Sequence, residues 1–263
     1  MKNKLKQILT SKRPAIGTWI SMTDPYGVEM VAGLGFDWLL IDMEHIPITK
    51  ETLLGILMAC KGSESVPIVR VASSSAEHFQ AALDMGAQGV MAPMINTAAD
   101  AALAVQYCRY PPQGRRGFGP LRAARYMKEA DSYRREANEE MLLFVQIETP
   151  EAVQNASAII RTPGIDGIFI GNGDLANFLN GDAKAGSANV QKVVDDLIAM
   201  ANKASIPIGL PTWSPEEFSR YAKLGAQLLT IGGDLAFLAV QAEAELAGVR
   251  RVLSGGEARP SKP

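Results

Sequence analysis

The sequence contains few cysteines, no excess of positive charge and no long apolar run, and each of these absences excludes a class of protein. Two cysteines, Cys60 and Cys108, are too few for a disulfide scaffold, and they do not form the C-x-x-C pair of a zinc or redox site. The 26 basic residues are balanced by 28 acidic ones, which leaves no basic surface for nucleic acid or a membrane. No window approaches the roughly 20 apolar residues that cross a bilayer. We therefore expect a cytoplasmic globular protein.

The chain alternates short apolar segments with segments of helical periodicity. The apolar segments are rich in β-branched residues and lie between polar or glycine-containing turns, which is typical of strands covered on both faces of a parallel sheet. They predict strands at residues 15–20, 38–41, 68–71, 89–92, 142–147, 167–170, 207–210 and 228–231. Helices are predicted near residues 25–34, 49–61, 75–85, 97–108, 150–160, 187–204, 215–224 and 234–248.

Eight strand–helix units in 263 residues predict an α/β fold, a single (β/α)8 TIM barrel. A doubly wound sheet would more often carry a glycine-rich fingerprint after its first strand, and GTWISMTD is not one. We predict one domain over residues 1–263, with an insertion at about 109–139 and a flexible tail after about 253. An insertion of this length is usually functional or a lid. Residues 177–189, rich in glycine, asparagine and alanine, form a second candidate mobile loop.

Two carboxylates stand at the ends of neighbouring predicted strands, and the carboxyl ends of barrel strands carry the active site. Glu148 and Asp174 are about one βα repeat apart, so we expect them at the same level. Converging carboxylates without cysteine or histidine close by suggest a hard divalent cation, Mg²⁺, Mn²⁺ or Co²⁺, with positions left open for substrate and water. The alternative is that each carboxylate caps a helix or pairs with an arginine.

A cation and a candidate base stand at two other strand ends. Arg70 is costly to bury unless its guanidinium meets an anion, such as a carboxylate or an enolate oxygen. An internal ion pair with Asp42 or Glu148 is the alternative. His45 lies three residues after Asp42, which can orient the imidazole and raise its basicity. Acid, base and cation together favour an enzyme over a ligand sensor, because a sensor needs no base.

Lysine does not occur at the predicted strand ends, and this argues against an aldolase that works through a lysine imine. We find no serine or cysteine nucleophile paired with a base, and no phosphate loop. The sixth strand runs into Gly171, Asn172 and Gly173, where backbone N–H groups could approach a bound carboxylate.

Six sequence blocks resemble the HpcH/HpaI family of class II, pyruvate-dependent aldolases. In chain order they are GTWISMTDPYGVEMVAGLGFDWLLIDMEH, VPIVRVA, GAQGVMAPMINTAADA, RYPPQGRRGFGP, FVQIETPEAV and GIDGIFIGNGDLA. They cover most of the chain, from about residue 17 to about residue 246. The resemblance implies a metal held by two carboxylates and small-molecule substrates, a 2-keto acid that forms an enolate and an aldehyde that the enolate attacks. It also implies a homo-oligomer, a hexamer of dimers that exchange their last helix.

Carried over position by position, the resemblance gives roles to the residues singled out above. It implies that Glu148 and Asp174 are the metal ligands, and that His45 is the base, assisted by Asp42. Arg70 would hold the ketone or enolate oxygen. The other implied contacts are Gln146 in the same site, the amides near Gly173 and Asp174 at the pyruvate carboxylate, and Trp19 and Asp84 on the aldehyde side, with Asp84 reaching a neighbouring subunit.

One block departs from the family pattern. The family's sixth strand ends in G-P-x-D-L-S, whereas this chain has GNGDLA at residues 171–176, which keeps Asp174 but alters the carboxylate-binding turn. Thr212 and Trp213 replace a more open aliphatic loop and are expected to narrow the aldehyde pocket.

Two alternative activities keep the metal–enolate site but change the reaction, a metal-dependent 2-keto acid decarboxylase and a coenzyme A thioester lyase. The lyase would need a basic groove for the nucleotide phosphates. The arginines that could supply it are Arg115, Arg116, Arg122 and Arg125. A solvated or intersubunit face explains the same cluster.

Overall fold

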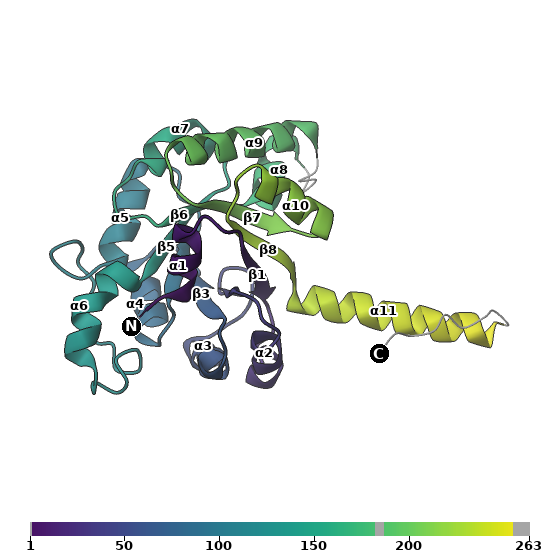
Figure 1. Cartoon of the computed structure of the whole chain (residues 1–263), viewed down its shortest axis with the longest axis horizontal. Coiled ribbons are helices and arrows are strands. Elements are labelled where there is room, and N and C mark those ends of the chain that lie inside the picture. Colours follow the sequence, from purple (N-terminus) through teal and green to yellow (C-terminus); the bar gives the residue numbers. More distant parts are fainter. Residues whose placement is uncertain (1, 182–186, 255–263) are drawn as a thin grey trace.

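The computed structural model describes residues 2–181 and 187–254 and shows a closed, eight-stranded parallel barrel surrounded by helices (Figure 1). Each strand pairs with the next, and β8 closes on β1, so the predicted (β/α)8 TIM barrel is confirmed. The strands are β1 (Ala15–Ile20), β2 (Trp38–Asp42), β3 (Val66–Arg70), β4 (Gly89–Ala92), β5 (Leu142–Ile147), β6 (Gly167–Ile170), β7 (Ile208–Thr212) and β8 (Leu228–Gly233).

Helices cover the outside of the barrel. They are α1 (Lys4–Thr10), α2 (Pro25–Ala32), α3 (Lys50–Ala59), α4 (Ala76–Asp84), α5 (Ala98–Cys108), α6 (Ala130–Glu140), α7 (Pro150–Ile160), α8 (Asn172–Asn180), α9 (Ala188–Lys203), α10 (Pro215–Lys223) and α11 (Asp234–Leu253). A short 3₁₀ helix, η1 (Cys60–Gly62), follows α3. None of the helices in the described residues has the length and hydropathy that crossing a lipid bilayer requires.

The predicted strands are all present, and β1, β4, β5 and β6 have the predicted bounds. The other strands differ by one or two residues. Asp42 and Thr212 are therefore the last residues of β2 and β7. The prediction had ended these two strands before them. Cys60 and Cys108 are buried free thiols.

Three helices were not predicted: α1, α6 and α8. α1 forms because the side chain of Asn3 accepts a hydrogen bond from the N–H of Lys6, and because Leu5 and Leu9, one helical turn apart, are buried beneath the barrel. α8 occupies the start of the predicted mobile loop at 177–189, so that part of the prediction is wrong. Residues 182–186 and the predicted tail from 255 onward lie outside the described residues.

The interior of the barrel is filled by side chains stacked in layers, as expected of this fold. Trp38 and Phe169 meet edge to face with ring centroids 6.2 Å apart, and Trp19 meets Phe169 in the same way at 6.2 Å. Gly17 makes room for Trp38, because a Cβ at this position would overlap the indole. The guanidinium of Arg70 lies over the Trp19 ring at 4.5 Å, so the aromatic stack ends in a charged layer at the carboxyl ends of the strands.

Two segments lie outside the basic repeat. The insertion at 109–139 consists of turns followed by α6, and Arg122 anchors it by donating to the carbonyls of Leu57 and Met85. α11 projects away from the barrel (Figure 1), and only its first residue, Asp234, is buried.

Candidate active site

A cavity of about 450 Å³ opens at the carboxyl ends of the strands. Nine of the residues singled out from the sequence line it, namely Trp19, His45, Arg70, Gln146, Gly171, Asn172, Gly173, Asp174 and Trp213. No residue of the insertion at 109–139 lies in its wall, so among the described residues the insertion is not a lid over this cavity. The cavity is therefore formed by strand ends and the loops that follow them.

Asp42 and Arg70 form the central ion pair of the cavity. They occupy paired positions on β2 and β3, and the carboxylate accepts hydrogen bonds from Nε at 2.9 Å and from Nη2 at 2.8 Å. Both side chains are 6% exposed. The internal pair considered from the sequence is thus present, and it fixes the plane of the guanidinium. Two of the five guanidinium N–H groups are used, which leaves those on Nη1 for another oxygen.

Glu44 was not assigned a role from the sequence, yet it faces both the cation and the base. Its Oε2 lies 3.2 Å from Arg70 Nη1 and 3.8 Å from His45 Nε2. This oxygen is buried and forms ion pairs without a hydrogen bond in the described residues. Burial raises the pKa of Glu44, and the charge of Arg70 opposes that rise. Glu44 therefore adds negative charge at the position where the candidate base lies.

His45 lies in the cavity wall with a side chain that is 58% exposed. The expectation that Asp42 orients its ring needs correction, because Asp42 Oδ1 accepts from the backbone N–H groups of Glu44 and His45 while the carboxylate is held by Arg70. Asp42 thus positions the His45 backbone, and the acid nearest the imidazole is Glu44.

Glu148 lies beneath the cavity and is 1% exposed. Its Oε1 accepts from the N–H of Met94 at 2.7 Å, and its Oε2 accepts from Gln146 Nε2 at 2.7 Å. Burial is the main cause that raises the pKa of Glu148 to about 7, and the nearby carboxylates of Glu44 and Asp174 raise it further. A bound cation would relieve the same repulsion.

The turn after β6 carries Asp174 and the two glycines. Gly171 is required by Glu148, since a Cβ at position 171 would overlap that carboxylate. Gly173 has open space where a Cβ would be. Asp174 lies in the first turn of α8, where the helix dipole favours a carboxylate. The sequence had linked both glycines to substrate binding, but Gly171 serves the packing of Glu148.

Residues on β1, β5 and β7 complete the cavity. Trp19 donates from its indole N–H to the Thr230 hydroxyl at 2.9 Å, which fixes the ring beneath Arg70. Gln146 presents a buried Oε1 that has no hydrogen-bond partner in the described residues. Thr212 does not line the cavity, because it is fully buried and donates to the Thr230 carbonyl at 2.7 Å. Its neighbour Trp213, 63% exposed, takes that place.

Asp84 lies at the end of α4, away from the cavity of its own chain, and pairs with Arg116 Nη2 at 2.5 Å. The expectation that it reaches a neighbouring subunit stays a prediction. The other arginines of the candidate basic groove also have partners within the chain. Arg115 stacks on Tyr107, Arg122 donates to backbone carbonyls and Arg125 pairs with Glu129. This dispersal argues against the coenzyme A alternative.

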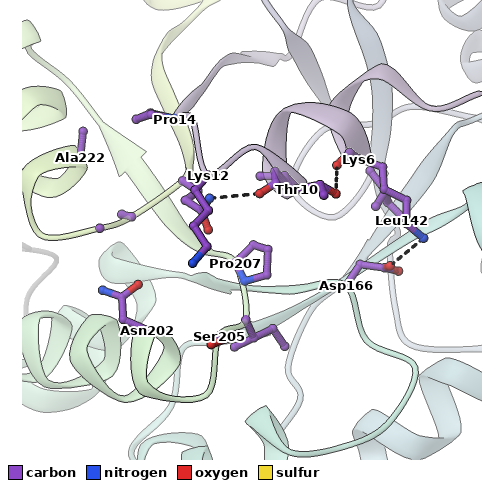
Figure 2. Close-up of a pocket in the computed structure, with 15 residues that line it drawn as sticks. Lys6, Thr10, Lys12, Pro14, Leu142, Asp166, Asn202, Ser205, Pro207 and Ala222 are labelled. Carbon is purple, nitrogen blue, oxygen red and sulfur yellow. Dashed lines mark hydrogen bonds and ion pairs between the residues drawn. The ribbon is translucent and has the colours of Figure 1, made fainter.

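A second hollow, also about 450 Å³, lies at the opposite, amino-terminal end of the barrel (Figure 2). Lys6, Thr10 and Lys12 approach it from α1 and the turn that follows. The acid in its wall, Asp166, already accepts from Arg109 at 2.6 Å and from the N–H of Leu143 at 2.9 Å. Asp166 is therefore engaged in holding the lower end of the barrel together, and stability is the usual role of this face.

The comparisons with known proteins show the family of the chain. The model of the HpcH/HpaI aldolase/citrate lyase family matches residues 15–240. This chain belongs to the HpcH/HpaI aldolase/citrate lyase family. It is 39% identical over 259 residues to the 4-hydroxy-2-oxo-heptane-1,7-dioate aldolase of Salmonella arizonae, a match that covers 97% of this chain and 98% of the relative.

Two solved structures show the same barrel. An HpcH/HpaI aldolase/citrate lyase family protein from Burkholderia cenocepacia superposes with a TM-score of 0.90 at 32% identity, covering 95% of this chain and all of the other. The citrate synthase SbnG superposes with a TM-score of 0.87 at 27% identity, covering 95% and 99%. Similar barrels thus carry the names of different reactions, so the donor and acceptor of this chain must be argued from its own cavity.

Proposed function

We propose that this protein is a metal-dependent aldolase, a carbon–carbon lyase that makes or breaks a 4-hydroxy-2-keto acid through a pyruvate enolate and an aldehyde. The observation that supports this most strongly is the grouping of Glu148, Asp174, Glu44 and Asp42 at one barrel mouth with Arg70 as the neighbouring cation. An enolate needs this kind of site, with a base for its proton and positive charge for its oxygen.

The residues of the site fit a divalent cation. Glu148 and Asp174 supply oxygen ligands, which Mg²⁺, Mn²⁺ and Co²⁺ accept. Glu148 is buried among other acids with its pKa raised to about 7, and the unpartnered Oε1 of Gln146 lies beside it. No group of three or more histidine, cysteine, aspartate or glutamate residues suited to a metal occurs in the described residues. We therefore infer that two carboxylates hold the ion and that substrate and water complete its shell.

In the proposed reaction the metal supplies Lewis-acid polarisation of the ketone. Arg70, held in plane by Asp42, donates from Nη1 to the ketone oxygen, where charge develops. The N–H groups of Gly173 and Asp174, at the start of α8, receive the carboxylate. His45 removes a proton from the methyl carbon, and that carbon forms a bond to the aldehyde carbon. The aldehyde oxygen then takes a proton back from the imidazole, which balances the addition.

We further infer that the active form is a homo-oligomer, with the family's hexamer as the specific expectation. Apolar side chains cover the projecting helix α11, although it makes few contacts with its own barrel. Those at least 41% exposed are Leu235, Phe237, Leu238, Val240, Leu246, Val249, Val252 and Leu253. An apolar surface of this kind on a helix outside the core is typical of a protein–protein interface.

Enolisation can be tested before the physiological aldehyde is known. The protein is incubated with pyruvate in D₂O, with Mg²⁺ or with a chelator, and the methyl proton signal is followed by NMR. We expect the signal to decay only with metal. Decay that continues unchanged in the chelator would remove the metal from the proposal. If no exchange occurs in either condition, pyruvate is not the donor, and oxaloacetate decarboxylation is the reaction to measure next.

A further inference from the structure

A third hollow, of about 740 Å³, lies between η1 and the insertion at 109–139, and we call it the cationic groove. Ser65 and Gln88, which directly precede β3 and β4, lie in its wall, so it opens at the amino-terminal ends of these strands. β3 ends in Arg70, at the opposite end of the barrel. A ligand in the cationic groove would therefore occupy a site separate from the candidate active site.

The charged side chains in the wall of the cationic groove that the structure describes are all basic. They are Lys2, Lys61, Arg122, Arg125 and Lys128. Arg125 pairs with Glu129, which lies outside the wall, and the other four form no ion pair within residues 2–181 and 187–254. Positive charges that surround one hollow repel one another, and an anion in the hollow would relieve this repulsion.

Arg122 is partly buried, whereas the other four basic residues are exposed. Its guanidinium donates to the carbonyls of Leu57 and Met85 and fills space that Gly86 leaves open, since a Cβ at position 86 would overlap Nη1. Carbonyl oxygens have no net charge, so they satisfy the N–H groups without neutralising the cation. Burial accordingly lowers the pKa of Arg122. The fold thus fixes an uncompensated cation in the wall of the groove.

A strained turn places an aromatic ring beside these cations. Arg125, Tyr126 and Met127 have φ values of +49°, +57° and +66°, in the left-handed region that residues other than glycine rarely adopt. Such strain persists only where the surrounding structure fixes it, and it is frequent at ligand-binding segments. The Tyr126 ring, 62% exposed, lies in the same wall as the cations. Nucleotide-binding surfaces combine these two groups, a ring that stacks on the base and cations that contact the phosphates.

We propose that the cationic groove binds a polyphosphate group, carried by a nucleotide whose base stacks on Tyr126. A single carboxylate would meet one or two of the five cations, whereas a chain of phosphates can contact several at once. The volume agrees, because small-molecule sites measure roughly 300–1,000 Å³. An inorganic polyphosphate would use the same cations without the ring, so Tyr126 distinguishes the two sources. The inference does not depend on the proposed aldolase function, since no residue of the candidate active site takes part.

The test measures dissociation constants of ATP and of tripolyphosphate by calorimetry. The full chain is used at physiological salt with a chelator, so that neither ligand binds through a metal ion at the active site. Lys61→Gln/Lys128→Gln removes two cations of the groove and leaves Arg122 to anchor the insertion. Lys203→Gln/Lys223→Gln removes the same charge from exposed positions on α9 and α10 and is the control. We expect both dissociation constants to rise about tenfold in the groove variant, because two cation–phosphate contacts are lost, and to stay unchanged in the control.

Tyr126→Ala should weaken ATP about fivefold or more, the effect of one base stacked on an aromatic ring, and should leave tripolyphosphate unchanged. Tyr126→Phe keeps the ring and should restore ATP binding. If Tyr126→Ala weakens neither ligand while the lysine variant weakens both, the polyphosphate site stands and its ligand is inorganic.

Two results would overturn the inference directly. One is a wild type that binds neither ligand, and the other is equal weakening in the two lysine variants, which would reflect net charge alone. Analytical ultracentrifugation with and without tripolyphosphate supplies a third check. An assembly that tripolyphosphate dissociates would also overturn the inference, because a second copy of the chain would then be the occupant of the groove.

Discussion

The Asp42 carboxylate and the Arg70 guanidinium occupy paired positions on β2 and β3 and are joined by two hydrogen bonds, at 2.9 and 2.8 Å. Both side chains are buried. Breaking such a pair leaves a buried charge uncompensated, which costs far more than breaking a pair at the surface.

Asp42→Asn should therefore lower the free energy of unfolding by about 3 kcal/mol and should also lower turnover, because the guanidinium is no longer held in plane. Urea denaturation and the aldol rate measure the two effects. Asp196→Asn, which breaks the exposed pair of Lys192 and Asp196, is the matched control and should change neither. Wild-type stability in Asp42→Asn would contradict the role given to the pair.

Glu148→Gln and Asp174→Asn should each lower the metal-dependent rate by roughly 10²–10³-fold or more while the barrel stays folded. Each variant removes one of the two proposed oxygen ligands. Metal titration calorimetry and circular dichroism separate loss of the ion from loss of the fold. Glu151→Gln, an exposed change in the first turn of α7, serves as the control. Unaltered metal affinity in both variants would show that the ion is held elsewhere.

The stability of the metal-free protein should depend on pH through Glu148. Its pKa is raised to about 7 in the fold and is near 4.5 when unfolded, so the native state holds more protons between these values. Its contribution to stability is full below about pH 4.5 and is lost as pH rises through about 7, by roughly 1 to 3 kcal/mol. Chelator-treated wild type and Glu148→Gln are compared by thermal unfolding across this range. The unfolding temperature should fall less steeply with rising pH in Glu148→Gln than in the wild type. Equal slopes in the two proteins would show that other groups cause the pH dependence.

His45→Ala should slow the exchange of pyruvate methyl protons by roughly 10²–10⁴-fold and should affect pyruvate binding much less. The imidazole acts on the C3 proton, whereas the carboxylate and ketone are held by other groups. NMR exchange rates and calorimetric binding constants report the two steps separately. His78→Ala, which changes the other histidine, on α4, is the control. Lost binding with normal exchange per bound molecule would argue against His45 as the base.

The apolar surface of α11 should be needed for self-association. Leu246→Glu places a charge among its exposed apolar side chains and should shift the protein to a smaller assembly, measured by analytical ultracentrifugation. Gln241→Glu adds the same charge on this helix at a residue that is already polar and should leave the assembly intact. A monomeric wild type at micromolar concentration would contradict the oligomer itself.

The barrel could be predicted from the sequence because its strands are buried on both faces and therefore appear as continuous apolar runs. α1 escaped prediction because its few apolar positions, Leu5 and Leu9, stand among lysines and become informative only when the barrel floor is present to cover them. α8 escaped because Asn172 and Gly173 favour turns, and tertiary packing outweighs that preference.

The candidate site was predictable as a set of strand ends, but the direction of each side chain was not. Pro211 and Trp213 line the cavity while Thr212 between them faces away, as the two-residue period of an extended chain requires. The sequence alone did not fix which of two adjacent residues faces inward. Glu44 was missed for a different reason: its importance comes from Arg70, which is 26 positions along the chain and becomes its neighbour only when β2 and β3 pair.

α1 has a practical consequence for handling the enzyme. It lies across the amino-terminal end of the barrel, where Lys6 and Thr10 border the lower hollow (Figure 2). The side chain of Asn3 ties it to the barrel by donating to the carbonyls of Gln88 and Glu140. α1 therefore lies on the side of the barrel opposite the candidate active site. An affinity handle or surface linker attached beside α1 would orient immobilised enzyme with its cavity toward the solution.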